Sequence, residues 1–278
     1  MNIKYFLALS IFSLVLGCSS PNDEVAERGA NLNAQLADEA ADASVYSFAS
    51  YRKIARGERF ERTALIEKYI LPLMQARVDS GQILNWTLWR VAYPRGGDYD
   101  DISIASANSY SQESSGGTFQ EQFEKLHGAG SMETFMNAAR MQADVVKTEI
   151  WRRNLAIGAT ERMPYIRIFY SKTNPGMNAE HRQLRDNIWQ PFVAEGIKTQ
   201  GAGWSSWDLV EPGSMAAPYN MASVSSYKDF ADMEPRDDFQ EVWARAHPDK
   251  NWPEIRAQFR AASTVARQET WQLVFTTQ

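Results

Sequence analysis

The stretch Trp86-Thr87-Leu88-Trp89 decides the fold of this chain, because a closely similar stretch, Trp204-Ser205-Ser206-Trp207, returns about 120 residues later. Each copy follows a glycine-containing segment and precedes a proline, Pro94 or Pro212. Other identities fall at nearly the same offset: Tyr51 with Tyr170, Lys53 with Lys172, Pro72 with Pro191, Tyr110 with Tyr227, His127 with His247, Glu149 with Glu269 and Trp151 with Trp271. A chain that matches itself at a fixed period contains an internal repeat. The sequence therefore predicts a tandem duplication.

Each copy is expected to contain, in order, a strand, a helix, two strands, a helix and a last strand. In the second copy, residues 164–170 are β-rich and alternating, and Leu184, Ile188 and Phe192 recur at the four-residue spacing of an amphipathic helix. The predicted elements of the second copy are strand 164–170, helix 178–195, strands 204–210 and 221–227, a helix from 239 to 262 broken near Pro248, and strand 267–276. Those of the first copy are strand 45–54, helix 58–79, strands 83–93 and 102–110, a helix from 118 to 142 broken at 128–130, and strand 147–157.

This βαββαβ order is that of a ferredoxin-like unit. Two such units in one chain resemble the dimeric α+β barrel superfamily. The resemblance implies an α+β fold in which two four-stranded sheets, from residues 45–160 and 161–278, pack face to face with helices outside. The tandem copy would supply both halves, so the chain would be a monomer. The superfamily includes quinol-type monooxygenases, haem-degrading enzymes, chlorite dismutase-like haem proteins and binding proteins, so the fold does not select an activity.

The first residues read as a targeting signal. A weakly positive start, residues 1–4, precedes an apolar run from Tyr5 to Leu16 that is too short to span a membrane comfortably. The following Gly17-Cys18-Ser19 resembles a bacterial lipoprotein lipobox, which implies a signal peptide at 1–17, a lipidated Cys18 and a tether through residue 44. The resemblance implies an envelope protein at the outer membrane, facing the periplasm. The alternatives are a secretory peptide with an incidental cysteine and an uncleaved membrane anchor.

The composition excludes one class of partner. The net charge is −5 and no basic stripe is present, whereas nucleic-acid binding requires clustered Lys and Arg. The single cysteine excludes a disulfide within the chain, so the core of the repeats must stabilise the fold by itself.

The paired tryptophans have a structural and a functional interpretation. Trp86 and Trp89 are three apart, as are Trp204 and Trp207, so the two members of each pair point to opposite faces of a strand. One should face the helices and the other the opposite sheet. Core anchoring is favoured, because packing must be satisfied in both halves. The alternative is an aromatic wall for a flat ligand.

His127 and His247 lie on the apolar faces of their helices and close to their ends. A histidine there can bond the last carbonyls and complement the helix dipole, which is the favoured interpretation. The alternatives are a haem ligand, a metal ligand and a general base. The third histidine, His181, has no counterpart in the first copy and receives no role. Three histidines argue against a multi-histidine metal site, and none is predicted.

Two further patterns remain open. Pro72 and Pro191 fall inside predicted helices and should kink them. The hydroxyl-bearing segments that end in Tyr110 and Tyr227 would line a pocket if they face inward, and would be ordinary surface if they face outward.

Two functional hypotheses follow from these residues. The favoured one is a lipid-anchored binding module without a cofactor, which holds a small, partly aromatic ligand or a partner protein. The alternative is a haem-dependent or cofactor-free oxidoreductase, with His247 or His127 as ligand or base and Tyr227, Tyr110 or Arg167 assisting.

Overall fold

The computed structural model describes residues 45–94, 96–158, 163–200, 202–213, 217–234 and 237–277. The predicted signal peptide, Cys18 and tether lie outside these residues. The first half contains β1 (Tyr46–Ile54), α2 (Arg59–Leu65), a π-helical turn (Ile66–Ile70), α3 (Leu71–Asp79), β2 (Asn85–Tyr93), β3 (Asp101–Ala107), α4 (Tyr110–Glu113), α5 (Phe119–His127), α6 (Ser131–Gln142) and β4 (Ala143–Gly158). The second half contains β5 (Tyr165–Thr173), α7 (Asn178–Leu184), a π-helical turn (Arg185–Trp189), α8 (Gln190–Gln200), β6 (Gly203–Glu211), β7 (Met221–Tyr227), a 3₁₀ turn (Ala231–Met233), α9 (Phe239–Ala246), α10 (Trp252–Ala262) and β8 (Ser263–Thr276). The duplicated βαββαβ order is confirmed.

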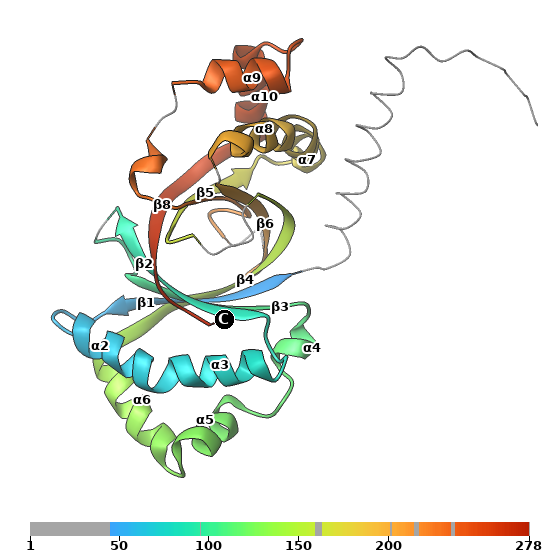
Figure 1. Ribbon diagram of the computed structural model, residues 1–278. Coiled ribbons are helices and arrows are strands. Elements are labelled where there is room, and N and C mark those ends of the chain that lie inside the picture. The colour runs from blue at the N-terminus through green and yellow to red at the C-terminus, as the bar shows by residue number, and fades with distance from the viewer. Residues whose placement is uncertain are drawn as a thin grey trace, which may run out of the picture. The chain divides into compact units, whose positions relative to one another are not determined.

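The strands form one closed barrel in the order β1-β3-β2-β8-β5-β7-β6-β4 (Figure 1). Closure depends on the last strand of each half. β4 pairs with β1 of its own half and with β6 of the other, and β8 pairs in the same way with β5 and β2. Every described strand therefore has two neighbours, and the barrel has no unpaired edge that could pair with another chain.

Helices cover the outside of the barrel in two groups, α2 to α6 on one side and α7 to α10 on the other (Figure 1). Because strand side chains alternate in direction, the outer faces pack against these helices and the inner faces fill the barrel. None of the described helices has the length and apolar character needed to cross a membrane.

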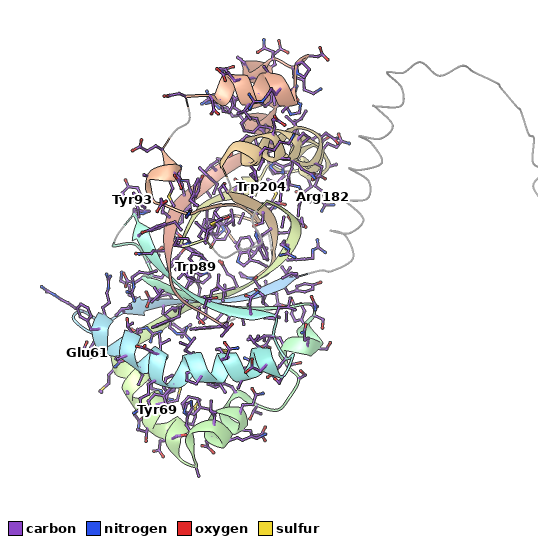
Figure 2. All side chains as sticks on the ribbon, in the orientation of Figure 1. Glu61, Tyr69, Trp89, Tyr93, Arg182 and Trp204 are labelled. Carbon is purple, nitrogen blue, oxygen red and sulfur yellow. The ribbon has the colours of Figure 1, made fainter. Side chains whose placement is uncertain are left out.

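The paired tryptophans take the directions that their spacing predicts. Trp86 packs with Ile66 and Met74 between β2 and the first-half helices, whereas Trp89 belongs to the cluster inside the barrel. Figure 2 shows Trp89 within the ring of strands and Trp204 on the side of the second-half helices. β2 and β6 are the second strands of their halves, so Trp86 and Trp204 occupy equivalent strands.

One predicted strand is too long. The strand expected over 102–110 ends at Ala107, and Tyr110 begins the short helix α4. The cause is local, because the Ser109 hydroxyl accepts a hydrogen bond from the backbone N–H of Gln112 at 3.1 Å and caps the helix. Tyr227, by contrast, is the last residue of β7, as predicted.

Candidate functional site

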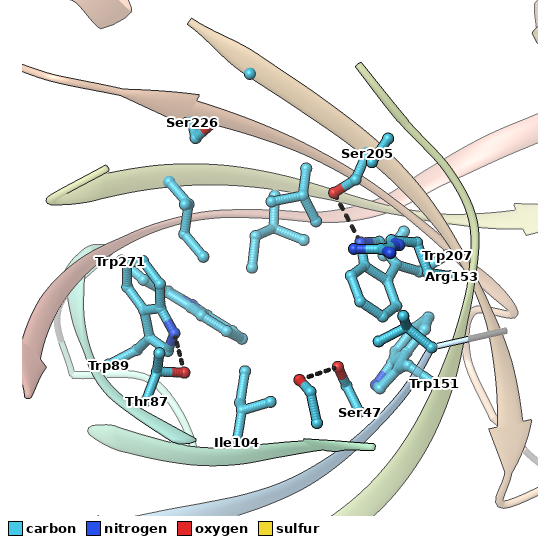
Figure 3. A pocket seen from close by; sticks show the side chains of 18 of the residues that line it. Ser47, Thr87, Trp89, Ile104, Trp151, Arg153, Ser205, Trp207, Ser226 and Trp271 are labelled. Atoms are coloured by element: carbon cyan, nitrogen blue, oxygen red, sulfur yellow. Dashed lines mark hydrogen bonds between the residues drawn. The ribbon is translucent and has the colours of Figure 1, made fainter. Parts of the chain in front are cut away.

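The barrel encloses a cavity of about 580 Å³ (Figure 3). Five tryptophans contribute to its wall: Trp89, Trp151, Trp204, Trp207 and Trp271. Trp89 Nε1 donates to Thr87 Oγ1 at 2.9 Å, and Trp207 Nε1 donates to Ser205 Oγ at 2.8 Å. These N–H groups are therefore satisfied within the protein, which leaves the rings to line the cavity.

A symmetric polar cluster closes one end of the barrel interior. Glu149 accepts hydrogen bonds from Tyr219 at 2.5 Å, Trp151 at 3.1 Å and Lys147 at 2.8 Å. In the other half, Glu269 accepts from Tyr99 at 2.6 Å and from Trp271 at 2.9 Å, and pairs with Arg267. Each buried carboxylate thus has a cation and two neutral donors, as a buried charge requires.

Burial dominates the ionisation of this cluster. It raises the pKa of Tyr99 and Tyr219, and the adjacent carboxylates raise the pKa of Tyr219 further. It lowers the pKa of Lys147, which Glu149 opposes. The tyrosines stay neutral and donate hydrogen bonds to the two buried carboxylates.

A second cavity, of about 840 Å³, lies outside the barrel in the second half. We call it the outer cavity. Its walls are the outward-facing side chains of β5 to β8 and the facing side chains of α7 and α10. Residues that line it include His181, Arg185, Trp189, Trp204, Ser206, Ser223, Trp252, Arg256, Phe259 and Arg260. Trp204 Nε1 donates to Ser223 Oγ at 2.8 Å, which holds this indole against the sheet.

Two buried polar atoms in the outer cavity lack partners. His181 Nδ1 and Ser206 Oγ make no hydrogen bond with any described residue. The His181 ring lies 6.2 Å from the Phe259 ring in an edge-to-face arrangement. Buried polar atoms are normally satisfied, and leaving one unsatisfied costs roughly 1–3 kcal/mol. Their convergence on one cavity indicates a ligand site.

The His181 imidazole is held in its neutral form. Burial lowers its pKa, the Arg185 guanidinium lowers it further, and the carboxylates of Asp208 and Asp186 oppose the shift. A neutral imidazole is the form that binds a metal. Among the described residues, no three His, Cys, Asp or Glu side chains gather as a metal site; His181 stands alone.

The equivalent space in the first half is filled by apolar side chains. There Ile66, Met74, Trp86, Leu88 and Ala105 pack together. When the two halves are aligned through Pro72 with Pro191 and Trp86 with Trp204, Arg185 takes the position of Ile66, and Ser206 takes the position of Leu88. A charged side chain and a small one thus replace two buried aliphatic ones, which accounts for the open space in the second half.

His181 itself replaces a buried arginine. Its equivalent, Arg62, lies 3.9 Å from Asp101, which also pairs with Arg90 at 3.0 Å. Burial lowers the pKa of Arg62 to about 10. In the second half, Met221 and Asp208 stand at the positions of Asp101 and Arg90. The structural ion cluster of the first half is therefore absent from the second, and a histidine takes its place.

The predicted candidates His127 and His247 are structural. His127 Nε2 donates to the Tyr69 carbonyl at 2.9 Å, and His247 Nε2 donates to the Ile188 carbonyl at 2.7 Å. Each acceptor belongs to a π-helical turn and lies three residues before Pro72 or Pro191. Because proline and the π-turn disturb the helical hydrogen bonds, the imidazole satisfies a carbonyl there. Neither histidine lines the barrel cavity or the outer cavity, so these contacts favour the structural interpretation over a haem ligand.

The assisting residues proposed from sequence do not gather around these histidines. Tyr110 is 40% exposed and packs edge-on against Tyr46 and Phe48. Arg167 lies over the Tyr227 ring at 5.9 Å, on the outer face of the second half. Arg167 and Tyr227 are therefore neighbours, whereas Tyr110 lies on a first-half helix.

The candidate site residue that sequence reasoning missed is His181. It has no role in the sequence-based hypotheses, because it has no counterpart in the first copy. That asymmetry was the available signal, since a residue that packing requires tends to recur in both halves, as His127 and His247 do.

Comparisons with known proteins support the fold. No protein-family model matches the sequence, and no curated protein does. Solved structures of similar fold include a candidate monooxygenase from Fusobacterium nucleatum, with 8% identity, a TM-score of 0.50 and coverage of 84% of this chain and 94% of that one. A chlorite dismutase variant from Candidatus Nitrospira defluvii has 11% identity, a TM-score of 0.47 and coverage of 84% and 92%. A haem-binding protein from Thermus thermophilus has 8% identity, a TM-score of 0.46 and coverage of 84% and 92%. The chain has the dimeric α+β barrel fold that the repeat predicted.

Two sequence-based expectations are corrected here. The sequence favoured a cofactor-free binding module over the haem or oxidoreductase alternative, and it predicted no cofactor. The similar structure with a TM-score of 0.50 is that of a candidate monooxygenase, a class that the alternative names. The outer cavity also presents a half-buried imidazole, His181, whose Nδ1 has no hydrogen-bond partner among the described residues, whereas His127 and His247 line neither cavity. The preference for a cofactor-free module was therefore wrong.

Proposed function

We propose that the outer cavity binds haem, with His181 as the axial ligand, and that the protein is a haem-dependent oxidoreductase. The observation that carries the proposal is the His181 ring, whose buried Nδ1 meets no described partner, in the wall of a cavity of about 840 Å³. A cavity of that size is within the range of roughly 300–1,000 Å³ typical of cofactor sites.

The other residues of the outer cavity suit a flat, largely apolar macrocycle with two carboxylates. Trp189, Trp252 and Phe259 supply apolar walls from the helices. Arg256 and Arg260 lie one turn apart on α10, so they share a face of that helix. Both line the cavity and are exposed at its rim. Guanidinium groups there can form charge-assisted bonds with propionates.

Haem would supply the redox chemistry, and the protein would supply orientation and electrostatics. The lowered pKa of His181 keeps the ligating nitrogen available at neutral pH. Ser206 leaves a hydroxyl without a described partner on the sheet side of the cavity, where it can bond a small oxygen-containing substrate.

Titration with hemin tests this proposal. We expect wild-type protein to shift the Soret band and saturate at one hemin per chain, and His181→Ala to lose that axial-ligand spectrum. His127→Ala and His247→Ala are matched controls, because they remove an imidazole elsewhere in the fold, and both should retain the spectrum. Added imidazole should restore it in His181→Ala by occupying the vacated space.

The proposal would be overturned by a wild-type protein that produces no Soret shift, or by His181→Ala protein whose hemin spectrum equals that of the wild type. Circular dichroism of each variant checks that folding is intact.

We also infer that the chain is a lipid-anchored envelope protein, attached through Cys18 and facing the periplasm from the outer membrane. The apolar run and the Gly17-Cys18 pair support this inference. The duplicated half-barrels support a monomer, because the second copy takes the place of a partner chain.

A further inference from the structure

We infer that the barrel interior is a second ligand site, which takes a small planar aromatic carboxylate. This site lies on the inner side of the barrel wall and the outer cavity on the other side; Trp204, Trp207 and Ala222 of that wall border both. Adjacent residues of β6 and β7 point to opposite sides: Ser205 and Val224 line the interior, whereas Ser206 and Ser223 line the outer cavity. The inference does not depend on haem binding.

The interior is suited to a flat ring. Its volume of about 580 Å³ is far above that of a packing defect in a close-packed core. Trp89, Trp207 and Trp271 reach it from β2, β6 and β8, so aromatic rings line it from several sides (Figure 3). Aromatic rings in contact at 4.5–7 Å add roughly 0.5–1.5 kcal/mol per pair beyond area burial.

Arg153 gives the cavity a cationic group. It lies on β4, where its register partner is Trp207 of β6, and its side chain lines the interior (Figure 3). No carboxylate forms an ion pair with Arg153 among the described residues. Burial lowers the pKa of its guanidinium. A partly buried cation that meets no counter-ion in the described part of the chain is costly, and a bound carboxylate would offset that cost.

The positive charge of Arg153 has no counterpart at the equivalent position in the second half. The equivalent of Arg153 in the second half is Leu273, because β4 and β8 are aligned through Glu149 with Glu269 and Trp151 with Trp271. Packing therefore does not require an arginine at this position. As with His181, an unmatched polar residue in a duplicated fold points to a role other than packing.

Several further polar groups lie in the same half as Arg153, whereas Ser205 and Ser226 line the cavity from the second half. Ser47 Oγ and Ser106 Oγ are 3.1 Å apart in the cavity wall formed by β1 and β3. The opposite wall carries Ile166, Ile168 and Val224. The cavity thus has a polar side beside an apolar one, which would hold a carboxylate against the first half and a ring against the second. The carboxylates of the closed end already have cationic partners.

Calorimetric titration with 2-naphthoate tests the inference. We expect saturable binding to wild-type protein and at least tenfold weaker binding to Arg153→Leu, which introduces the residue of the second half. A tenfold change corresponds to about 1.4 kcal/mol. Arg153→Lys keeps the charge and should bind within a few-fold of wild type. Neutral 2-naphthamide should bind wild type at least tenfold more weakly than 2-naphthoate.

Further measurements separate this site from the haem proposal. His181→Ala should bind 2-naphthoate as wild type does, and Arg153→Leu should retain the hemin spectrum. If Arg153→Leu does not fold, Ser47→Ile, which introduces the residue of the equivalent Ile166, should weaken 2-naphthoate by roughly threefold. The inference is wrong if wild type does not bind 2-naphthoate, if Arg153→Leu binds it equally well, or if hemin displaces it competitively.

Discussion

Replacing His247 with alanine should destabilise the protein without affecting cofactor binding. The ring is 6% exposed, its Nε2 bonds the Ile188 carbonyl at 2.7 Å, and it lies 4.8 Å from the Trp243 ring. A buried carbonyl left without its donor costs roughly 1–3 kcal/mol, and the lost aromatic contact costs roughly 0.5–1.5 kcal/mol. We therefore expect a loss of about 3 kcal/mol in the free energy of unfolding.

Thermal unfolding followed by circular dichroism measures this loss. For a domain of this size, 1 kcal/mol shifts Tm by roughly 2–4 °C, so His247→Ala should lower Tm by about 6–12 °C. His127→Ala is the matched comparison, because His127 makes the same bond to the Tyr69 carbonyl at 2.9 Å but is less buried. Its Tm should fall by less. The structural role would be refuted if His247→Ala kept the wild-type Tm and lost the hemin spectrum.

Three other predictions concern separate parts of the chain. In haem-free protein, the pKa of His181 lies below its ordinary value of 6.5, so the protein should lose stability as the pH falls below 6.5 and the unfolded chain takes up a proton more readily than the folded one. Denaturant titrations at several pH values should show this loss of stability, and His181→Phe should make the loss smaller. Gly158→Ala should cost about 2 kcal/mol or more in unfolding measurements, because φ is +89° and a Cβ would lie 2.5 Å from the Ala202 carbonyl oxygen; Gly176→Ala, with φ of +80° and open space, should cost less. Cys18→Ala should release the protein from membranes in cell fractionation, and a full-length variant that remained with the membranes would indicate an uncleaved anchor instead.

Much of the architecture could be predicted because short stretches of sequence determine each element, and each stretch occurs in both halves of the chain. Alternation along strands and four-residue spacing along helices are properties of short segments. Duplication then supplied an independent copy of each pattern. The opposite directions of Trp86 and Trp89 followed from their odd spacing alone. The error at Tyr110 also had a local cause, the Ser109 cap, which a pattern of alternating residues did not reveal.

Recurrence in both halves is a poor indicator of a functional site in this protein. Residues that recur, such as His127 and His247, were the first candidates, yet each satisfies a backbone carbonyl that its own half exposes. His181 and Arg153 do not recur, and each borders one of the two cavities. Residues shared by both halves meet the needs of packing, whereas unmatched residues mark where the halves differ.

The sequence by itself determined the repeat, the order of elements and the face of each strand on which a side chain lies. Only the tertiary structure decided that the sheets close into a single barrel through β4 and β8, and that space remains beside His181. The reason is physical. A cavity is the volume that side chains from several distant segments leave unfilled. The second half has Arg185 and Ser206 where the first has Ile66 and Leu88, and this exchange leaves a cavity only because the folded chain places the helix against the sheet.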